Sequence, residues 1–191
     1  MLPLKILCWN IEHFNGHGGK DRHTRVLREK RIQEVVAFIK AEDPDVFAIS
    51  EVTGRDVYNY FTHEMPGYSF AITEGNQSQE IMTAYKKTLT CFVSQRNEFK
   101  RNNPYLRPAS LVTIREGDVH VPILFTHLKS MPSPEGFGLR DAMIEKLYSL
   151  KKAIDKSARA LSAGAQEYGN FNIVGDMNTM GLDYYRTEND I

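Results

Sequence analysis

Apolar residues occur in two patterns along this chain: short continuous runs, and longer segments with a helical period. The clearest helical segment has apolar residues every three or four positions from Leu139 to Leu161, and this stripe is predicted to face the core. A second helix is predicted over 24–42, ahead of Pro44, and a weaker one over 56–63. Short runs predict strands over 4–9, 46–50, 68–73, 81–86, 88–94, 110–115, 121–127 and 171–174.

The order of these elements predicts a mixed α/β fold. A strand–helix–strand unit comes first, a series of strands forms the middle, and a helix followed by a strand comes last. The sequence contains no internal repeat, low-complexity segment or linker. Residues 1–191 are therefore predicted to form a single domain.

Polar side chains follow four of the apolar runs at the point where each run stops. They are Asn10 and Glu12, then Glu51, then His127, and finally Asp176 with Asn178. Ligand sites in open α/β sheets lie outside the carboxyl ends of the strands, so these side chains are predicted to converge on one cleft. Carboxylate and amide oxygens, with little sulfur and no clustered imidazole, favour a hard cation such as Mg²⁺, Mn²⁺ or Ca²⁺ over zinc.

Composition is that of an ordinary soluble globular protein, with 41% apolar and 25% charged residues. Cys8 and Cys91 lie in strand-like runs and are predicted to be reduced, buried thiols rather than a disulfide. No run approaches the roughly 20 apolar residues of a membrane span, and the first residues are too polar for a signal peptide. We therefore expect a cytoplasmic protein with no membrane span.

The 24 basic and 24 acidic residues balance, but their distribution is uneven. Lys and Arg concentrate in 15–31 and in 85–107. These segments are either two solvated surfaces or one positive face for a polyanion. In the second case Lys20, Arg22, Lys100 and Arg101 are expected to flank the cleft.

Five short motifs resemble, in order, those of the endonuclease/exonuclease/phosphatase superfamily, whose fold is that of deoxyribonuclease I. They are CWNIEHF, DVFAISEV, LRPASLV, FTHLKS and IVGDMN, and they match in type, order and approximate spacing over residues 5–178. The resemblance implies a four-layer αββα sandwich of two packed mixed β-sheets, with the site at one edge. It also implies hydrolysis of a phosphate ester that depends on Mg²⁺ or Mn²⁺.

The resemblance implies roles for the residues at the strand ends. Glu51 matches the principal metal carboxylate, and Asn10 supports the metal or the phosphate. Glu12 falls where some members carry an acid near the metal. Asp176 resembles the residue that orients or deprotonates the attacking water, and Asn178 the one that holds a phosphate oxygen.

Three more residues are implied to act on the phosphate. His127 matches the histidine that hydrogen-bonds the scissile phosphate, Glu80 is similar to the acid that pairs with this histidine, and Arg107 resembles a phosphate-contacting arginine. A neighbouring Glu would raise the pKa of the histidine and keep it charged. A divalent ion, a cationic His and an Arg would stabilise the negative charge that hydrolysis builds on oxygen. For Glu80 and Arg107 an ordinary surface role stays open.

The chain departs from the family pattern after Asn178. Members usually close with a Ser-Asp-His motif, whereas the thirteen residues after Asn178 contain no histidine. We expect either a fragment or a truncated relative that lacks the last strands of the fold and is weakly active or inactive.

Three functions fit these observations. The first is a Mg²⁺-dependent phosphodiesterase that hydrolyses nucleic acid, with DNA favoured because of the two basic segments. The second is a phosphatase or phosphodiesterase of inositol lipids, sphingolipids or a soluble phosphate ester, since the motifs are shared by those branches. The third is a catalytically impaired module that only binds polyanions.

Overall fold

The computed structural model describes residues 3–15, 24–100, 102–103 and 106–179. Within these ranges the elements follow one another in an order close to the predicted one. They are β1 (Ile6–Phe14), α1 (Arg25–Glu42), β2 (Val46–Val52), α2 (Arg55–Glu64), β3 (Tyr68–Ile72), β4 (Glu80–Lys86), β5 (Thr90–Arg96), the 3₁₀-helix η1 (Asn97–Lys100), β6 (Ala109–Glu116), β7 (Val119–His127), α3 (Pro134–Leu161) and β8 (Asn172–Asp176).

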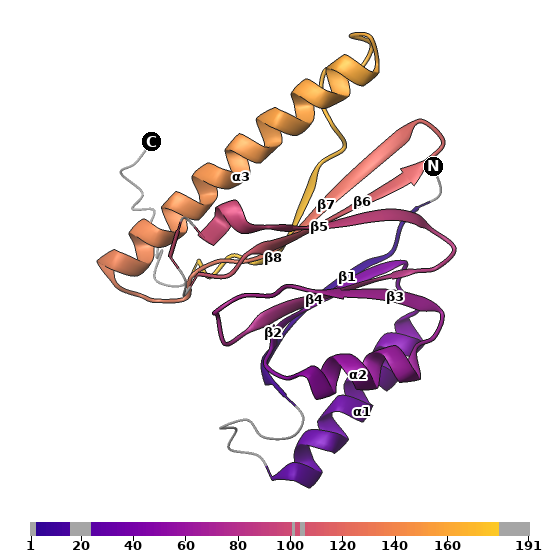
Figure 1. Cartoon of the computed structure of the whole chain (residues 1–191), viewed down its shortest axis with the longest axis vertical. Coiled ribbons are helices and arrows are strands. Elements are labelled where there is room, and N and C mark those ends of the chain that lie inside the picture. Colours follow the sequence, from indigo (N-terminus) through magenta and orange to yellow (C-terminus); the bar gives the residue numbers. More distant parts are fainter. Residues whose placement is uncertain (1–2, 16–23, 101, 104–105, 180–191) are drawn as a thin grey trace, which may run out of the picture.

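The strands form two four-stranded mixed sheets. Sheet A has the order β1-β2-β4-β3, in which β1 and β2 are parallel and the other pairs antiparallel. Sheet B has the order β5-β6-β7-β8, in which β7 and β8 are parallel and the other pairs antiparallel. Helices α1 and α2 cover the outer face of sheet A, and α3 covers that of sheet B (Figure 1). The predicted αββα sandwich with mixed sheets is confirmed.

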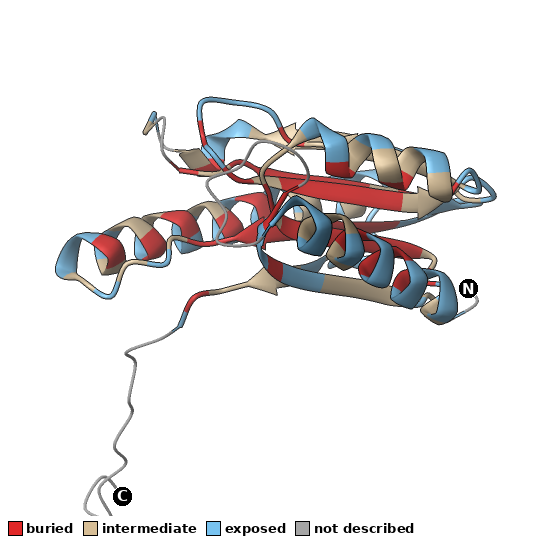
Figure 2. Ribbon diagram, turned by 90° about the horizontal axis from the view of Figure 1, so that it is seen from below, coloured by how far each residue is buried: buried red, intermediate tan, exposed pale blue. Residues whose placement is uncertain are grey.

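Apolar side chains fill the three spaces between these four layers. Buried residues run along the strands and along the inner faces of the helices (Figure 2). The layer between the helices and sheet A is centred on Phe14, Phe47 and Phe61. The layer between sheet B and α3 includes Leu124, Met143, Leu147 and Leu150. The layer between the two sheets comprises Val46, Ala48, Ile81, Val112, Ile114, Val121, Ile123 and Phe125.

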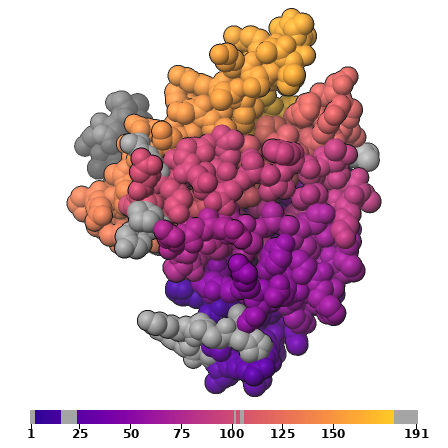
Figure 3. Space-filling model, viewed as in Figure 1, coloured from indigo at the N-terminus to yellow at the C-terminus, as the bar shows by residue number. Residues whose placement is uncertain are grey.

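The two sheets come from successive parts of the chain. In Figure 3 the earlier residues, in indigo and purple, form the lower part of the molecule, and the later residues, in orange, form the upper part. Between the sheets, the buried hydroxyls of Thr83 on β4 and Ser110 on β6 lie 3.2 Å apart and share a hydrogen bond. The layers are thus joined by packing and by a satisfied polar contact.

Helix α3 begins earlier than predicted and ends at the predicted Leu161. It begins at Pro134, inside the predicted loop, because the Ser133 hydroxyl caps it by accepting a hydrogen bond from the Gly136 amide. At the other end Leu161 is 77% exposed, so the apolar stripe leaves the core before the helix ends. A cavity of about 460 Å³ lies between this part of the helix, near Ile154, and sheet B.

Strand β1 is longer than predicted and carries Asn10 and Glu12 within it rather than after it. Asn10 pairs with Ser50 of β2, beside Glu51, and the register then shifts between Asn10 and Phe14. Such an irregularity re-aims side chains at the end of a strand. The pairing of β1 with β2 therefore makes Asn10 a neighbour of Glu51.

Two further sequence predictions can be compared with the structure. Cys8 and Cys91 are free thiols, as predicted, and burial raises the pKa of each to about 11. In the part of the chain that the structure describes, no helix has the length and apolar character needed to cross a bilayer.

Gly175 permits the close approach of β8 to β7. It pairs with Thr126, one position before the His127–Asp176 pair. A Cβ atom on Gly175 would lie 1.9 Å from the Thr126 carbonyl oxygen, and its φ of +153° is one that side chains rarely allow. Glycine therefore breaks this apolar strand because the neighbouring backbone occupies the space of a side chain.

We expect Gly175→Ala to destabilise the fold by about 1–3 kcal/mol, because the added methyl must push β8 off β7. Chemical denaturation measures this. Gly138→Ala is the matched control: it adds a methyl on α3 where nothing lies within 4 Å, and helix propensity should make it slightly stabilising. Equal stability of the Gly175→Ala variant and the wild type would contradict this account of the β7–β8 contact.

Candidate active site

The ends of the two sheets bring together residues from distant parts of the chain. The Asn10 amide nitrogen donates to Glu51 Oε1 at 3.3 Å and to Asp176 Oδ2 at 2.7 Å. Asn10 and Glu51 belong to sheet A, whereas Asp176 belongs to sheet B. One amide thus joins two carboxylates across the sandwich, and these residues with His127 form what we call the acidic cluster.

Glu51 is held from several sides. It has a left-handed backbone, with φ of 65°, and its Oε2 accepts hydrogen bonds from the His13 amide at 3.1 Å and from Gln79 Nε2 at 2.6 Å. Burial favours the protonated carboxyl, but the hydrogen bonds from the His13 backbone amide and the Asn10 side chain, with the charge of Arg107, keep the Glu51 pKa below its ordinary value. Glu51 is therefore ionised at neutral pH.

The D-x-N segment, which begins at the last residue of β8, forms a turn that orients the Asp176 carboxylate. Asp176 Oδ1 accepts a hydrogen bond from the Asn178 backbone amide at 2.9 Å, which leaves Oδ2 to face Asn10. The buried Asn178 side chain donates to the Leu128 carbonyl at 2.8 Å. The Asn178 side chain thus anchors the end of β8 to the residue that follows β7. The expected contact of Asn178 with a phosphate oxygen stays a prediction.

His127 lies beneath the two carboxylates, with a side chain only 1% exposed. Its Nε2 is 3.8 Å from Glu51 Oε1 and 3.9 Å from Asp176 Oδ2. Burial, reinforced by the positive charge of Arg107 and only partly offset by the two acids, lowers the His127 pKa to about 4. The expectation of a charged imidazole is therefore wrong: His127 is neutral at pH 7.

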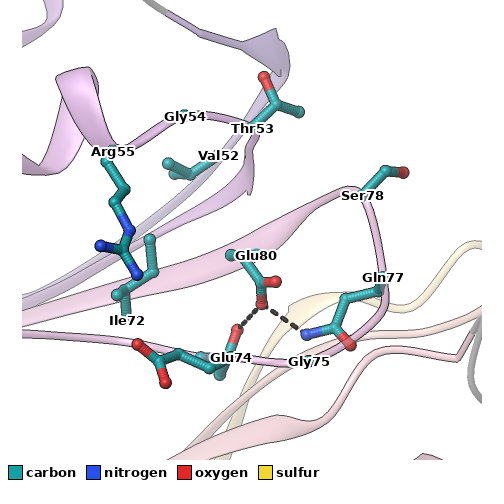
Figure 4. A pocket seen from close by; sticks show the side chains of 11 residues that line it. Val52, Thr53, Gly54, Arg55, Ile72, Glu74, Gly75, Gln77, Ser78 and Glu80 are labelled. Carbon is teal, nitrogen blue, oxygen red and sulfur yellow. Dashed lines mark hydrogen bonds between the residues drawn. The ribbon is translucent and has the colours of Figure 1, made fainter.

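Glu80 does not pair with His127 as expected. Its Oε2 accepts hydrogen bonds from Thr73 Oγ1 and Gln77 Nε2, both at 2.6 Å (Figure 4). Among the described residues the His127 Nδ1 atom has no hydrogen-bond partner. Glu80 instead lines a pocket of about 440 Å³ with residues at the end of β2, at the start of α2 and in the loop before β4.

Glu12 lies next to the cluster without being a member of it. It lines a hollow beside α1 together with Asn10, Trp9 and Phe38. The metal role that the resemblance implies for Glu12 stays a prediction.

Of the four basic residues expected to flank the cleft, Lys100 lies within the described residues. Lys100 Nζ donates to the Gln77 amide oxygen at 2.7 Å, close to the Glu80 pocket. Lys20, Arg22 and Arg101 lie outside the described residues.

Arg107 is linked to the cluster by a residue that the sequence analysis missed. Its guanidinium donates to the amide oxygen of Gln79, whose nitrogen donates to Glu51. Burial lowers the Arg107 pKa, yet a guanidinium stays protonated in proteins. Gln79 lies directly before β4, outside any strand or helix pattern, so no periodic signal in the sequence pointed to it.

Three residues of the site have backbones in the left-handed region. They are His13, Glu51 and Asn178, with φ of 45°, 65° and 47°. Each such conformation costs about 1–3 kcal/mol for a residue other than glycine and persists only where its surroundings enforce it. The hydrogen bonds at Glu51 and Asn178 supply that enforcement.

The residues of the acidic cluster suit a hard divalent cation. Two carboxylates converge on one amide and one neutral imidazole, so negative charge exceeds positive charge there. Within the described ranges, no group of three or more His, Cys, Asp or Glu side chains is arranged to hold a metal ion alone. Two carboxylates with an amide match the partial protein coordination of Mg²⁺, which keeps several waters or substrate oxygens.

Comparison with solved structures finds the same fold in proteins of low identity. TDP2 of C. elegans gives a TM-score of 0.64 at 20% identity, over 92% of this chain and 48% of that one. D. rerio TDP2 complexed with a single-stranded DNA product gives 0.64 at 14% identity, over 92% and 60%. A mannosyl-6-phosphatase of Bacteroides thetaiotaomicron gives 0.57 at 13% identity, over 92% and 66%.

An endonuclease/exonuclease/phosphatase of Bacteroides vulgatus gives a TM-score of 0.58 at 13% identity, over 92% and 66%, so the fold is the one that the sequence motifs predicted. No family model and no curated protein matches the chain. The chain spans about half the length of the C. elegans structure.

The raised pKa of Glu80 predicts how the stability of the fold changes with pH. Burial raises its pKa, so this group favours folding below the unfolded pKa of about 4.3, and that contribution is lost as the pH rises through the folded pKa. We therefore expect Glu80→Gln to match the wild type in stability near pH 3 and to exceed it at pH 7.

Thermal or urea denaturation at both pH values checks the Glu80 prediction. Exposed Glu116→Gln, which removes the same charge from the other sheet, is the control. A Glu80→Gln protein less stable than the wild type at pH 7 would mean that Thr73 and Gln77 stabilise the ionised carboxylate.

Proposed function

We propose that this chain carries the active-site cluster of a divalent-metal-dependent phosphodiesterase that hydrolyses nucleic acid. The observation that carries the proposal is the convergence of Glu51 and Asp176, from different sheets, on the Asn10 amide and on His127. Two ionisable acids held together by a neutral amide form an anionic site that a cation would complete.

The residues of the cluster divide the chemistry of hydrolysis between them. Glu51 and Asn10 would hold Mg²⁺ or Mn²⁺, which when bound supplies positive charge to a phosphate oxygen. Asp176 Oδ2 contacts the Asn10 amide while Oδ1 is held by the Asn178 amide, and this carboxylate would accept a proton from an attacking water.

His127 and Arg107 would act on the phosphate itself. The carboxylates near His127 Nε2 favour the tautomer with hydrogen on that atom, so the neutral imidazole would donate a hydrogen bond without adding charge. Arg107 is the cation nearby, and its charge acts on both Glu51 and Asp176. A half-buried guanidinium can stabilise the charge that develops on phosphate oxygens.

Nucleic acid is the favoured substrate because one structural neighbour is complexed with single-stranded DNA and because the chain has two basic segments. A second candidate is a soluble phosphate monoester, which the similarity to a mannosyl-6-phosphatase favours. Both reactions would use the same cluster.

The proposal is tested by Mg²⁺-dependent hydrolysis across single-stranded DNA, duplex DNA, RNA, a phosphoinositide and a hexose 6-phosphate. We expect activity on single-stranded nucleic acid that EDTA abolishes, with Asp176→Asn about 10²- to 10⁴-fold slower because the proton acceptor is lost. Glu51→Gln should weaken Mn²⁺ binding, measured by electron paramagnetic resonance, at least about tenfold.

The control for these variants is Glu74→Gln, an acid exposed outside the cluster. Hydrolysis of the hexose phosphate alone would support the second candidate. Unchanged Mn²⁺ affinity in Glu51→Gln would overturn the assignment of the metal carboxylate.

Salt dependence separates a polyanion from a small phosphate ester. If the protein neutralises about three phosphates of single-stranded DNA, its affinity should fall roughly twentyfold between 50 and 200 mM salt, because counterions are released on binding. Fluorescence anisotropy with a labelled oligonucleotide measures this. Affinity that is the same at both salt concentrations would count against the nucleic-acid substrate.

A further inference from the structure

Gln79 bridges a cation and an anion of the candidate site. Its side-chain nitrogen donates to Glu51 Oε2 at 2.6 Å, and its oxygen accepts from the Arg107 guanidinium. It is only 8% exposed, and the same nitrogen lies 3.3 Å from the ring of His13. The side chain is therefore held, immediately before β4, between two groups of opposite charge.

Arg107 forms no ion pair among the described residues, although the acids Glu51, Asp176 and Glu80 all act on its charge. Arginine and a carboxylate normally pair directly, often through two parallel hydrogen bonds. The hydrogen-bond partner of Arg107 here is an amide. The Gln79 amide occupies the line along which Arg107 and Glu51 would otherwise meet.

We propose that Gln79 is a positioning residue that keeps Arg107 and Glu51 apart, so that Glu51 stays free for a cation and Arg107 for a phosphate oxygen. The inference rests on the proposed function for the roles of these two groups. A direct Arg107–Glu51 pair would satisfy both charges and leave neither for a ligand.

An amide is the side-chain group suited to this place. It donates at one end and accepts at the other, and it carries no charge at any pH. A glutamate there would pair with Arg107 and repel Glu51. An alanine would leave space into which the guanidinium could move. Gln79 therefore meets a requirement that neither an acid nor an apolar residue meets.

Gln77 supplies a matched control from the same loop. Its nitrogen donates to Glu80 Oε2 at 2.6 Å and its oxygen accepts from Lys100 Nζ at 2.7 Å, so it too links an acid to a cation. It is 9% exposed, almost as buried as Gln79. Gln77→Ala removes an equivalent bridge without touching Glu51, and so reports the purely structural cost.

The test measures Mn²⁺ affinity by titration calorimetry in Gln79→Ala, Arg107→Ala, the double variant and Gln77→Ala. We expect Gln79→Ala to bind Mn²⁺ about 10- to 100-fold more weakly, as is usual when the partner of a metal ligand is lost. Removing Arg107 in the same chain should restore most of that loss, because nothing then neutralises Glu51. Gln77→Ala should bind as the wild type does.

A crystal structure of Gln79→Ala provides a readout independent of metal. The proposal predicts that the Arg107 guanidinium moves to within about 4 Å of the Glu51 carboxylate, the limit for an ion pair. An Arg107 that stays in place overturns the proposal. So does a double variant that binds Mn²⁺ no better than Gln79→Ala.

These outcomes differ from a failure of the proposed function. A wild-type protein that binds no Mn²⁺ and hydrolyses no phosphate ester would refute the enzyme. The position of Arg107 in Gln79→Ala would still decide whether Gln79 separates the two charges.

Discussion

The side chains of Asn10 in sheet A and Asp176 in sheet B meet at 2.7 Å, and this contact depends on how the two sheets pack. The apolar layer between the sheets, with Val46, Ala48 and Phe125 completely or almost completely buried, sets their spacing. Close packing makes that spacing insensitive to small changes at the surface. The candidate site is therefore a consequence of the core, since each sheet supplies only part of it.

Neutral amides connect the charged groups at this junction. Asn10 lies between two carboxylates, Gln79 lies between Glu51 and Arg107, and Asn178 orients Asp176 through its backbone. Direct pairing of buried charges would satisfy them internally, whereas amides hold them in place and leave their charge available. Together with a neutral His127, this gives a site with excess negative charge, suited to a cation, beside a half-buried arginine.

The same region contains unfavourable features that the rest of the fold must offset. It contains the left-handed backbones at His13, Glu51 and Asn178, and the His127 Nδ1 atom, which has no hydrogen-bond partner in the part of the chain that the structure describes. Strained conformations and unsatisfied polar atoms at a site are maintained by the stability of the surrounding structure. At Gly175 strain is avoided instead, because glycine has no side chain that could clash with the Thr126 carbonyl oxygen.

The sequence by itself determined the class of the fold, most of the elements and four members of the cluster. The periods of its apolar residues predicted strands and helices close to the observed ones, and the polar residues after four of those runs included Asn10, Glu51, His127 and Asp176. These features are local, because a strand or helix pattern and its end are written in consecutive residues.

Only the tertiary structure decided which polar residues meet. It turned Glu80 toward Thr73 and Gln77, left Glu12 beside α1, and placed Gln79 between Glu51 and Arg107. It also made His127 neutral, because the pKa of a buried group depends on desolvation and on charges brought from distant parts of the chain, which no local pattern encodes.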